Sequence, residues 1–298
     1  MPCIWFKQKS IQSGLIRLPK YGEYLAKQFT LTEFESAGLS ITGPAREDNQ
    51  DAILLPGSSA PSAAGCLHAV ADGMGGYANG ALASSLALQH LVKTVRACEP
   101  STPPKKVLKQ AFETLNFEVY KASQQLDNVR MGTTLTAAYI TGNLLNLLHI
   151  GDSRAYLIRH GRATLLTTDH TTVGEMVRAR LISPDRLRTH EKRSVLTRAV
   201  GLALFAQPEL TQTNLHVGDR IILCSDGVWS VIEDPVFAKS SDQAEHAHAL
   251  VNDLVNLAVA NKTDDNCSVV AIQIRGFRYH SFDDEPHKTG SWLGFLRK

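Results

Sequence analysis

Several aspartates in this chain stand beside apolar runs, where the end of a β-strand can aim a carboxylate. Asp72-Gly73 directly follows the run 66–71, and Asp226-Gly227 directly follows the run 221–225. A short apolar run predicts a buried strand, and a glycine after the aspartate lets the chain turn sharply. Four aspartates share this kind of placement: Asp72, Asp152, Asp226 and Asp265. Such strand ends can direct several carboxylates at one point.

The chemistry that converging carboxylates would serve is the binding of a hard divalent cation. A single Asp-Gly is an ordinary turn. Several ionised carboxylates held together repel one another unless cations neutralise them. Ligand sets made only of oxygen suit Mg²⁺ or Mn²⁺ better than Zn²⁺. If these strand ends converge, the sequence predicts a Mg²⁺ or Mn²⁺ site.

A guanidinium stands near the same candidate strands. Arg46 lies between Gly43-Pro44 and the strand candidate 51–55. Arginine offers a fixed fork of donors that matches a phosphoryl group. Taken alone, Arg46 is equally what an ordinary surface turn contains, so its role depends on where the fold places it.

Composition excludes several classes of function. The 298 residues are 43% hydrophobic and carry a formal charge of +2, which is not the strongly basic balance of a nucleic-acid-binding surface. The five cysteines form no C-x-x-C pair, which argues against a disulfide framework or a thiolate zinc site. No run is apolar enough for a membrane span. We expect a cytoplasmic monomer with no integral membrane segment and no nucleic-acid partner.

The elements that would position these residues are mostly antiparallel strands. Strand candidates are 39–43, 51–55, 66–71, 133–141, 144–150, 154–159, 162–166, 210–216, 220–225 and 268–275. Apolar residues at helical spacing predict helices over about 76–97, 104–126 and 242–260. Prolines 100, 103 and 104 separate the first two, as in an antiparallel helix pair. Many antiparallel strands with paired helices indicate an α+β sandwich.

The two ends of the chain lack this regular pattern. We expect an N-terminal extension over 1–36, a catalytic domain over 37–276 and a C-terminal tail over 277–298. The extension mixes basic and aromatic residues, which fits either a segment packed on the domain or a docking arm for a partner or membrane surface.

The ordered motifs resemble the metal-dependent type 2C protein phosphatases (PPM) in their bacterial form. The resemblance spans about residues 39–275. Its motifs are Arg46-x-x-Asn49-Gln50-Asp51, Val70-Ala71-Asp72-Gly73-Met74-Gly75-Gly76, Gly132-Thr133-Thr134, Gly151-Asp152-Ser153-Arg154, Asp169-His170, Cys224-Ser225-Asp226-Gly227-Val228-Trp229 and Asp265-Asn266. It implies a four-layer αββα sandwich, in which two antiparallel sheets are flanked by helix pairs and metals bind at one edge.

The resemblance also implies a metal-ligand set. Asp72 would bridge two Mn²⁺ or Mg²⁺ ions, and Gly73 would give its backbone carbonyl to one of them. Asp226 and Asp265 would complete the protein ligands of the first ion. Asp152, together with Asp226, matches a more labile third metal site.

The implied catalytic residues are Arg46, Asp51 and Asp72. Arg46 would bind the substrate phosphate, and Asp51 would hold a water of the metal centre. The other signature positions are interpreted as mainly structural: Gly132, Thr133, Thr134, Asp169, His170 and Asn266.

Two residues depart from the family pattern. Met74 stands where eukaryotic relatives place a histidine as candidate general acid, so the acid is unassigned. Gln50 stands where many relatives have glutamate, and a neutral amide there would weaken the charge around the second metal.

These residues lead to a hypothesis of function: a protein-serine/threonine phosphatase that uses metal-activated water. Hydrolysis of phosphate monoesters is among the slowest uncatalysed reactions, and one general acid or base contributes only about 10²–10⁴-fold. Two metals can activate water and neutralise the phosphoryl oxygens. No Cys-x₅-Arg loop offers a covalent alternative, and Cys224 is interpreted as a small core residue. The rival interpretation is a non-catalytic phosphoprotein scaffold or regulatory pseudophosphatase of the same fold.

Partner choice is the least determined part of the sequence. The expected substrates are proteins phosphorylated on serine or threonine by a partner kinase, and an anti-sigma-type regulatory switch would differ only in its partner. Residues 172–201 correspond to the variable flap of the family and are rich in arginine and lysine. That excess fits either acidic, phosphorylated substrates or a solvated helix and loop.

Overall fold

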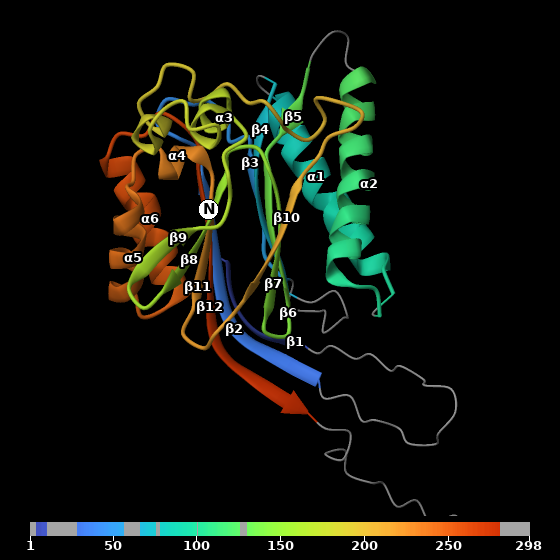
Figure 1. Cartoon of the computed structure of the whole chain (residues 1–298), viewed down its shortest axis with the longest axis vertical. Helices are drawn as coiled ribbons and strands as arrows, with labels where there is room; N and C mark the ends of the chain where they lie inside the picture. Colours follow the sequence, from blue (N-terminus) through green and yellow to red (C-terminus); the bar gives the residue numbers. More distant parts are fainter. Residues whose placement is uncertain are drawn as a thin grey trace, which may run out of the picture.

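The protein is built on two antiparallel sheets that pack face to face. The computed structural model describes residues 4–10, 29–56, 66–75, 78–99, 101–125 and 130–280. One sheet has the order β1 (Ile4–Ser10), β2 (Phe29–Ile41), β12 (Cys267–His280), β11 (Arg220–Cys224), β8 (Arg154–Arg159), β9 (Arg162–Leu165) (Figure 1). The other has the order β10 (Glu209–Asn214), β7 (Leu144–Ile150), β6 (Leu135–Thr141), β4 (Cys66–Met74), β3 (Asp51–Leu54), and β5 (Gly132–Thr133) pairs with β4.

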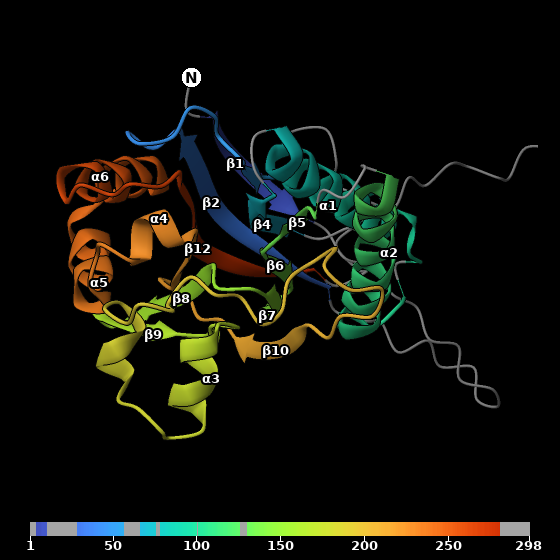
Figure 2. The ribbon, with the colours of Figure 1, turned by 90° about the horizontal axis from the view of Figure 1, so that it is seen from above.

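Helices cover the outer face of each sheet, as Figure 2 shows from above. α1 (Ala78–Ala97) and α2 (Pro104–Gln125) lie on the β10–β3 sheet, and α5 (Asp234–Gln243) and α6 (Ala247–Ala260) lie on the β1–β9 sheet. The short α4 (Asp226–Trp229) follows β11 directly. Between β9 and β10, α3 (Thr172–Arg178) and a 3₁₀ turn (Pro184–Leu187) belong to the flap, residues 172–201.

Three apolar layers hold this arrangement together. The middle layer joins the inner faces of the two sheets through residues such as Val70, Leu147 and Ile272. The outer layers join each sheet to its helices, with Leu91 in one and Val251 in the other. This is the four-layer αββα sandwich that the motifs predicted, and the α+β class is confirmed.

The first core strand is longer than the sequence indicated. β2 begins at Phe29 rather than near Leu39, because it pairs with β12 over its whole length, from Cys267↔Ile41 to His280↔Phe29. Its polar members Thr32, Glu35 and Ser36 are buried, which hides the usual alternation of apolar and polar residues. The limits expected for the catalytic domain, 37 and 276, therefore fall inside β2 and β12.

Other expected elements differ mainly at their ends. β1 lies in the segment expected to be an extension and pairs antiparallel with β2. The helix expected over 242–260 begins at Ala247, because His246 has an extended backbone, and α5 precedes it as a separate helix. Residues 11–28 and 281–298 of the two end segments lie outside the described residues. None of the described helices combines the length and apolar character that crossing a membrane requires.

Candidate active site

Two of the predicted site residues face each other across neighbouring strands. Asp51 and Asp72 are directly opposite in the β3–β4 ladder. The hydroxyl of Ser225 donates to Oδ2 of Asp51 at 2.8 Å. Because opposed residues of an antiparallel pair lie close together, β-pairing alone brings these two carboxylates to one place.

The backbone of Asp72 is held by β5 and the residue after it, Thr134. The Asp72 amide donates to Oγ1 of Thr134 at 2.9 Å, and the Thr134 amide donates to the Asp72 carbonyl at 2.8 Å. The Thr133 hydroxyl donates to the same carbonyl at 2.9 Å. The two threonines therefore position Asp72.

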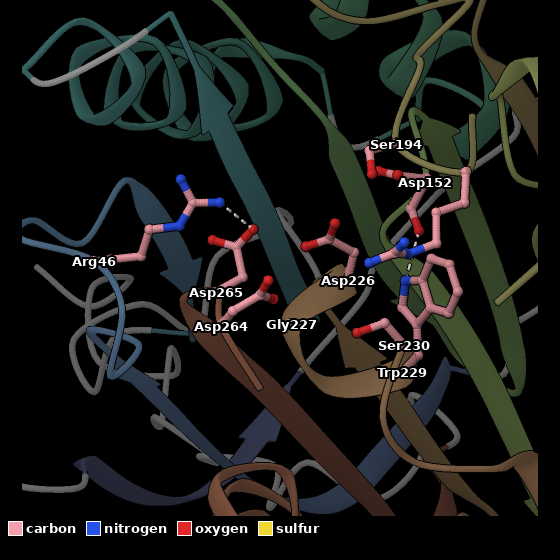
Figure 3. Close-up of a pocket in the computed structure, with 10 residues that line it drawn as sticks. Arg46, Asp152, Ser194, Asp226, Gly227, Trp229, Ser230, Asp264 and Asp265 are labelled. Atoms are coloured by element: carbon pink, nitrogen blue, oxygen red, sulfur yellow. Dashed lines mark hydrogen bonds and ion pairs between the residues drawn. The ribbon is translucent and has the colours of Figure 1, made fainter. Parts of the chain in front are cut away.

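The opposite sheet supplies Asp226 and Asp265. Asp226 opens α4 directly after β11, and Asp265 lies just before β12. These two loops touch, because a Cβ on Gly227 would stand only 2.1 Å from the carbonyl oxygen of Asn266. Figure 3 shows both aspartates at one pocket with Asp152, and the pocket has a volume of about 120 Å³.

Arg46 reaches the same pocket from the loop before β3. Its Nη2 forms an ion pair with Oδ2 of Asp265 at 2.6 Å (Figure 3). The Arg46 side chain is 52% exposed, so its guanidinium is accessible from solvent. The structure thus places Arg46, Asp152, Asp226 and Asp265 around one pocket. Asp51 and Asp72 lie near enough for their charges to interact with those of Asp226 and Asp265.

Burial and mutual repulsion raise the pKa values of these carboxyl groups. Burial raises the pKa of Asp51 to about 7; hydrogen bonds from Ser268 and Ser225 oppose the rise, and the Asp226 and Asp265 charges add to it. Burial, with the charge of Asp265 second, raises the pKa of Asp226 to about 6.

The other two carboxyl groups behave in the same way. Burial raises the pKa of Asp72 well above its usual range, and the charges of Asp51, Asp226, Asp152 and Asp265 raise it further. Burial and the charge of Asp226 likewise raise the pKa of Asp152. Without a cation, this cluster of negative charge is therefore unfavourable.

The donor set fits a hydrated Mg²⁺ or Mn²⁺ ion. Oδ1 of Asp226 is buried and has no hydrogen-bond partner among the described residues. Across those residues, no three His, Cys, Asp or Glu side chains gather closely enough to enclose an ion by themselves. Mg²⁺ is normally bound by one or two carboxylates and several waters, so looser carboxylates around an open pocket match its needs.

The Gly73 carbonyl, the expected backbone ligand, lies beside Gln50. A Cβ on Gly80 would stand 2.1 Å from Oε1 of Gln50 and 2.7 Å from the Gly73 oxygen. Gly80 therefore leaves room for both oxygens at the start of α1. Gly80 belongs to none of the sequence motifs, so its role is visible only in this tertiary contact.

The loop that carries Asp152 is held in place by side-chain contacts that the sequence did not predict. Gly151 has φ +106°, a conformation that favours glycine, and its amide donates to Nδ1 of His170 at 3.1 Å. Arg154 forms two hydrogen bonds with Asp169, at 2.9 and 2.7 Å, in a fully buried pair. The indole Nε1 of Trp229 donates to the Asp152 carbonyl at 2.9 Å.

Comparison with solved structures establishes the class of this fold. The structure of the serine/threonine phosphatase PstP/Ppp from Mycobacterium tuberculosis matches with a TM-score of 0.73 and 33% identity, over 82% of this chain and 99% of that one. The Streptococcus agalactiae serine/threonine phosphatase matches with a TM-score of 0.74 and 29% identity, over 81% of this chain and all of that one. These neighbours are phosphatases with the PPM fold.

The family follows from the sequence comparison. Residues 42–267 match the family described as Protein phosphatase 2C, and the chain belongs to this family. It is 35% identical over 250 residues to the serine/threonine protein phosphatase PstP of Mycobacterium tuberculosis, covering 82% of this chain. The chain spans 45% of that relative's length. The resemblance drawn from the motifs is confirmed.

Proposed function

We propose that this protein removes phosphate from phosphoserine and phosphothreonine of proteins, with two Mn²⁺ or Mg²⁺ ions at the aspartate cluster. The observation that carries the proposal is the convergence of the half-buried Asp51, Asp72 and Asp226, whose charges repel one another and raise their pKa values unless a cation binds. A solved structure of the PstP catalytic domain, 31% identical to this chain, is described as a complex with two manganese ions.

Each residue has a distinct part in the proposed reaction. When bound, the two ions would lower the pKa of water to make a nucleophile and neutralise the phosphoryl oxygens. Asp72 is the proposed bridging ligand, with the Gly73 carbonyl, Asp226 and Asp265 completing the set. Arg46 binds the substrate phosphate, exchanging its ion pair with Asp265 for a two-pronged contact with phosphoryl oxygens. Asp51, held by Ser225, positions water through its carboxylate.

The direct test is phosphatase turnover on a phosphoserine peptide with and without Mn²⁺. We expect metal-dependent turnover for the wild type and its loss in Asp72→Ala and Asp226→Asn. Equal, metal-independent rates in all three proteins would refute the proposal. Absence of Mn²⁺ binding in calorimetry would favour the scaffold alternative instead.

We predict that Asp152→Asn is milder than changes at the core ligands. Asp152 lies across the pocket from Asp265 and Arg46, in the loop after β7 (Figure 3). Its proposed role is at the labile third site, so the two core ions should still bind. Calorimetry should show unchanged binding of those two ions, while turnover falls by about 10–100-fold. Loss of core binding would contradict this assignment.

We predict that Gln50→Glu tightens Mn²⁺ binding. The Gln50 side-chain oxygen lies beside the proposed Gly73 ligand, and a carboxylate there would add negative charge to the second site. We expect the dissociation constant to fall by about 10-fold at pH 7.5, measured by calorimetry, because stronger charge near a ligand changes metal affinity on that scale. The effect should shrink as pH falls and the new carboxyl protonates. Unchanged affinity would show that Gln50 does not influence the site.

The same proposal extends to the substrates, the location and the domain limits of the protein. The substrates are proteins phosphorylated by a partner kinase, the enzyme acts in the cytoplasm as a monomer, and 37–276 is the catalytic domain. The basic residues of the flap, which lies beside the pocket through Arg193 and Ser194, favour acidic substrates. Rates on phosphopeptides that differ only in flanking acidic residues test this preference.

A further inference from the structure

One arginine of the flap is bonded to the body of the domain. Arg188 donates from Nε to the Trp229 carbonyl at 3.0 Å and from Nη2 to the Ile232 carbonyl at 3.1 Å. Its Nη2 also pairs with Oδ1 of Asp234 at 2.7 Å. The guanidinium therefore spans the end of α4 and the start of α5. By contrast, Arg178 and Arg198 pair with Glu175, inside the flap.

Trp229, whose carbonyl accepts a hydrogen bond from Arg188, also contacts the Asp152 loop. Trp229 is 2% exposed, and its indole Nε1 donates to the Asp152 carbonyl at 2.9 Å. The Arg154 guanidinium lies over the indole, with its carbon 3.6 Å from the ring centroid. Arg188 lies on the same ring system at 5.8 Å. Trp229 is thus in contact with the flap through its carbonyl and its ring, and with the Asp152 carbonyl through its indole N–H.

We propose that Arg188 and Trp229 are positioning residues that couple the placement of the flap to the placement of Asp152. Arg188 seats the flap on α4, and Trp229 passes the position of α4 to the Asp152 loop through its indole N–H. Flap opening and displacement of Asp152 are then parts of one motion. The role of Asp152 at a third metal site rests on the proposed function, but the mechanical coupling does not.

This coupling has a clear physical basis. Asp152 cannot move independently of Trp229 without leaving a buried indole N–H unpaired, which is costly. Trp229 is in turn fixed by Arg154, which is itself locked by Asp169. Arg188 is the partly exposed end of this chain of contacts, since 25% of its side chain is accessible. The flap can therefore release at Arg188 without unfolding the core.

Hydrogen exchange in the metal-free protein tests the coupling without reference to activity. In Arg188→Ala, we expect amide exchange over the flap and over 151–153 to rise together by about fivefold or more, since a charged hydrogen-bond cluster is lost. Arg188→Lys, which keeps the charge opposite Asp234, should restore part of the protection. Arg186→Ala removes an exposed arginine two residues away and should change neither segment.

A double-mutant cycle identifies Trp229 as the link. Trp229→Phe removes the N–H donor and replaces the indole by a smaller aromatic ring, so it should raise exchange at 151–153 on its own. In that background, Arg188→Ala should open the flap but add nothing at 151–153. The proposal would be overturned if the two changes had additive effects on amide exchange at 151–153. It would also be overturned if Arg188→Ala alone raised exchange in the flap but not at 151–153. If Trp229→Phe fails to fold, Arg188→Ala is compared with Arg188→Lys instead, because Asp234 also accepts a hydrogen bond from Tyr156 and pairs with Arg154. Exchange at 151–153 should then follow exchange in the flap across the two variants, and a change in the flap without one at 151–153 would overturn the proposal.

Steady-state kinetics separates this proposal from the proposed function. With the loaded enzyme, Arg188→Ala should raise KM for a phosphopeptide several-fold and lower kcat for both the peptide and a small aryl phosphate, because Asp152 is displaced. If the wild-type protein had no phosphatase activity, the proposed function would be refuted. The exchange data would still decide whether the flap and Asp152 are coupled. Coupled exchange with unchanged kcat for both substrates would refute the positioning role in the reaction.

Discussion

Replacing Asp72 by asparagine is expected to abolish phosphatase turnover and binding of both core metal ions. Asp72 is the proposed bridge between the two ions, and its half-buried carboxylate interacts with the charges of Asp51, Asp226 and Asp265. Loss of a shared carboxylate takes a negatively charged ligand from both ions at once. We expect turnover to fall at least about 10³-fold, as for loss of a principal electrostatic contact in an active site. Turnover of a phosphoserine peptide and Mn²⁺ calorimetry measure the two effects.

Although Asp72→Asn should abolish turnover and metal binding, we expect it to raise the stability of the metal-free protein. The asparagine carries no charge, so repulsion within the cluster is relieved, and the metal-free Asp72→Asn protein should melt at a higher temperature than the metal-free wild type. Asp264→Asn is the matched control, because it removes an exposed carboxylate beside the same pocket. The control should keep its turnover within about threefold and its two metal ions. Retention of two-ion binding by Asp72→Asn would contradict the bridging assignment.

The metal-free protein is expected to lose stability as pH rises from about 4 to 7.5, and Mn²⁺ is expected to restore it. Asp226 has a folded-state pKa of about 6 and Asp51 one of about 7, both above the usual aspartate value of 3.8. The folded state then holds more protons than the unfolded state across this window. Stability therefore falls as pH rises through the folded-state values. One pKa unit corresponds to about 1.4 kcal/mol, so rises from 3.8 to about 7 and to about 6 set an upper bound of about 7 kcal/mol on the decrease.

Urea unfolding at a series of pH values, with and without Mn²⁺, measures this dependence. Cations bind the deprotonated carboxylates, so their stabilisation should grow with pH and flatten the profile. Other groups also titrate, and the difference between the two profiles isolates the metal site. Asp72→Asn should show little of that difference. Wild-type profiles that run parallel with and without Mn²⁺ would show that the ions do not bind at this cluster.

The two predictions share one physical cause. The cluster stores unfavourable charge in the folded protein, and a cation converts that charge into binding energy. Asp226 illustrates the point, because its buried Oδ1 has no partner among the described residues. Structural order at this edge is therefore expected to depend on the metal more than the rest of the sandwich does.

Much of the fold was predictable because its signals are local. The helices 78–97 and 104–125 and most strands carry clear periodicity, and their observed ends lie within a few residues of those expected. The buried polar residues of β2 break the pattern, so the sequence predicts a shorter strand than the structure has. Glu35 shows why: it is 3% exposed, yet it accepts hydrogen bonds from Arg275 and from the first amide of α6. Such partners come from distant segments, so no local window contains them.

The site likewise combines features that local sequence determines with features that only long-range packing determines. The residue types and the strand ends that carry Asp72 and Asp226 are local properties, and the sequence by itself determined them, along with the family. The tertiary structure decided that Asp51 faces Asp72 across a ladder and that Arg46 pairs with Asp265 over 219 positions. It also decided that Trp229 joins the flap to Asp152. Strand ends are set by neighbouring residues, whereas convergence of charges is set by packing between the sheets, which no spacing along the chain encodes.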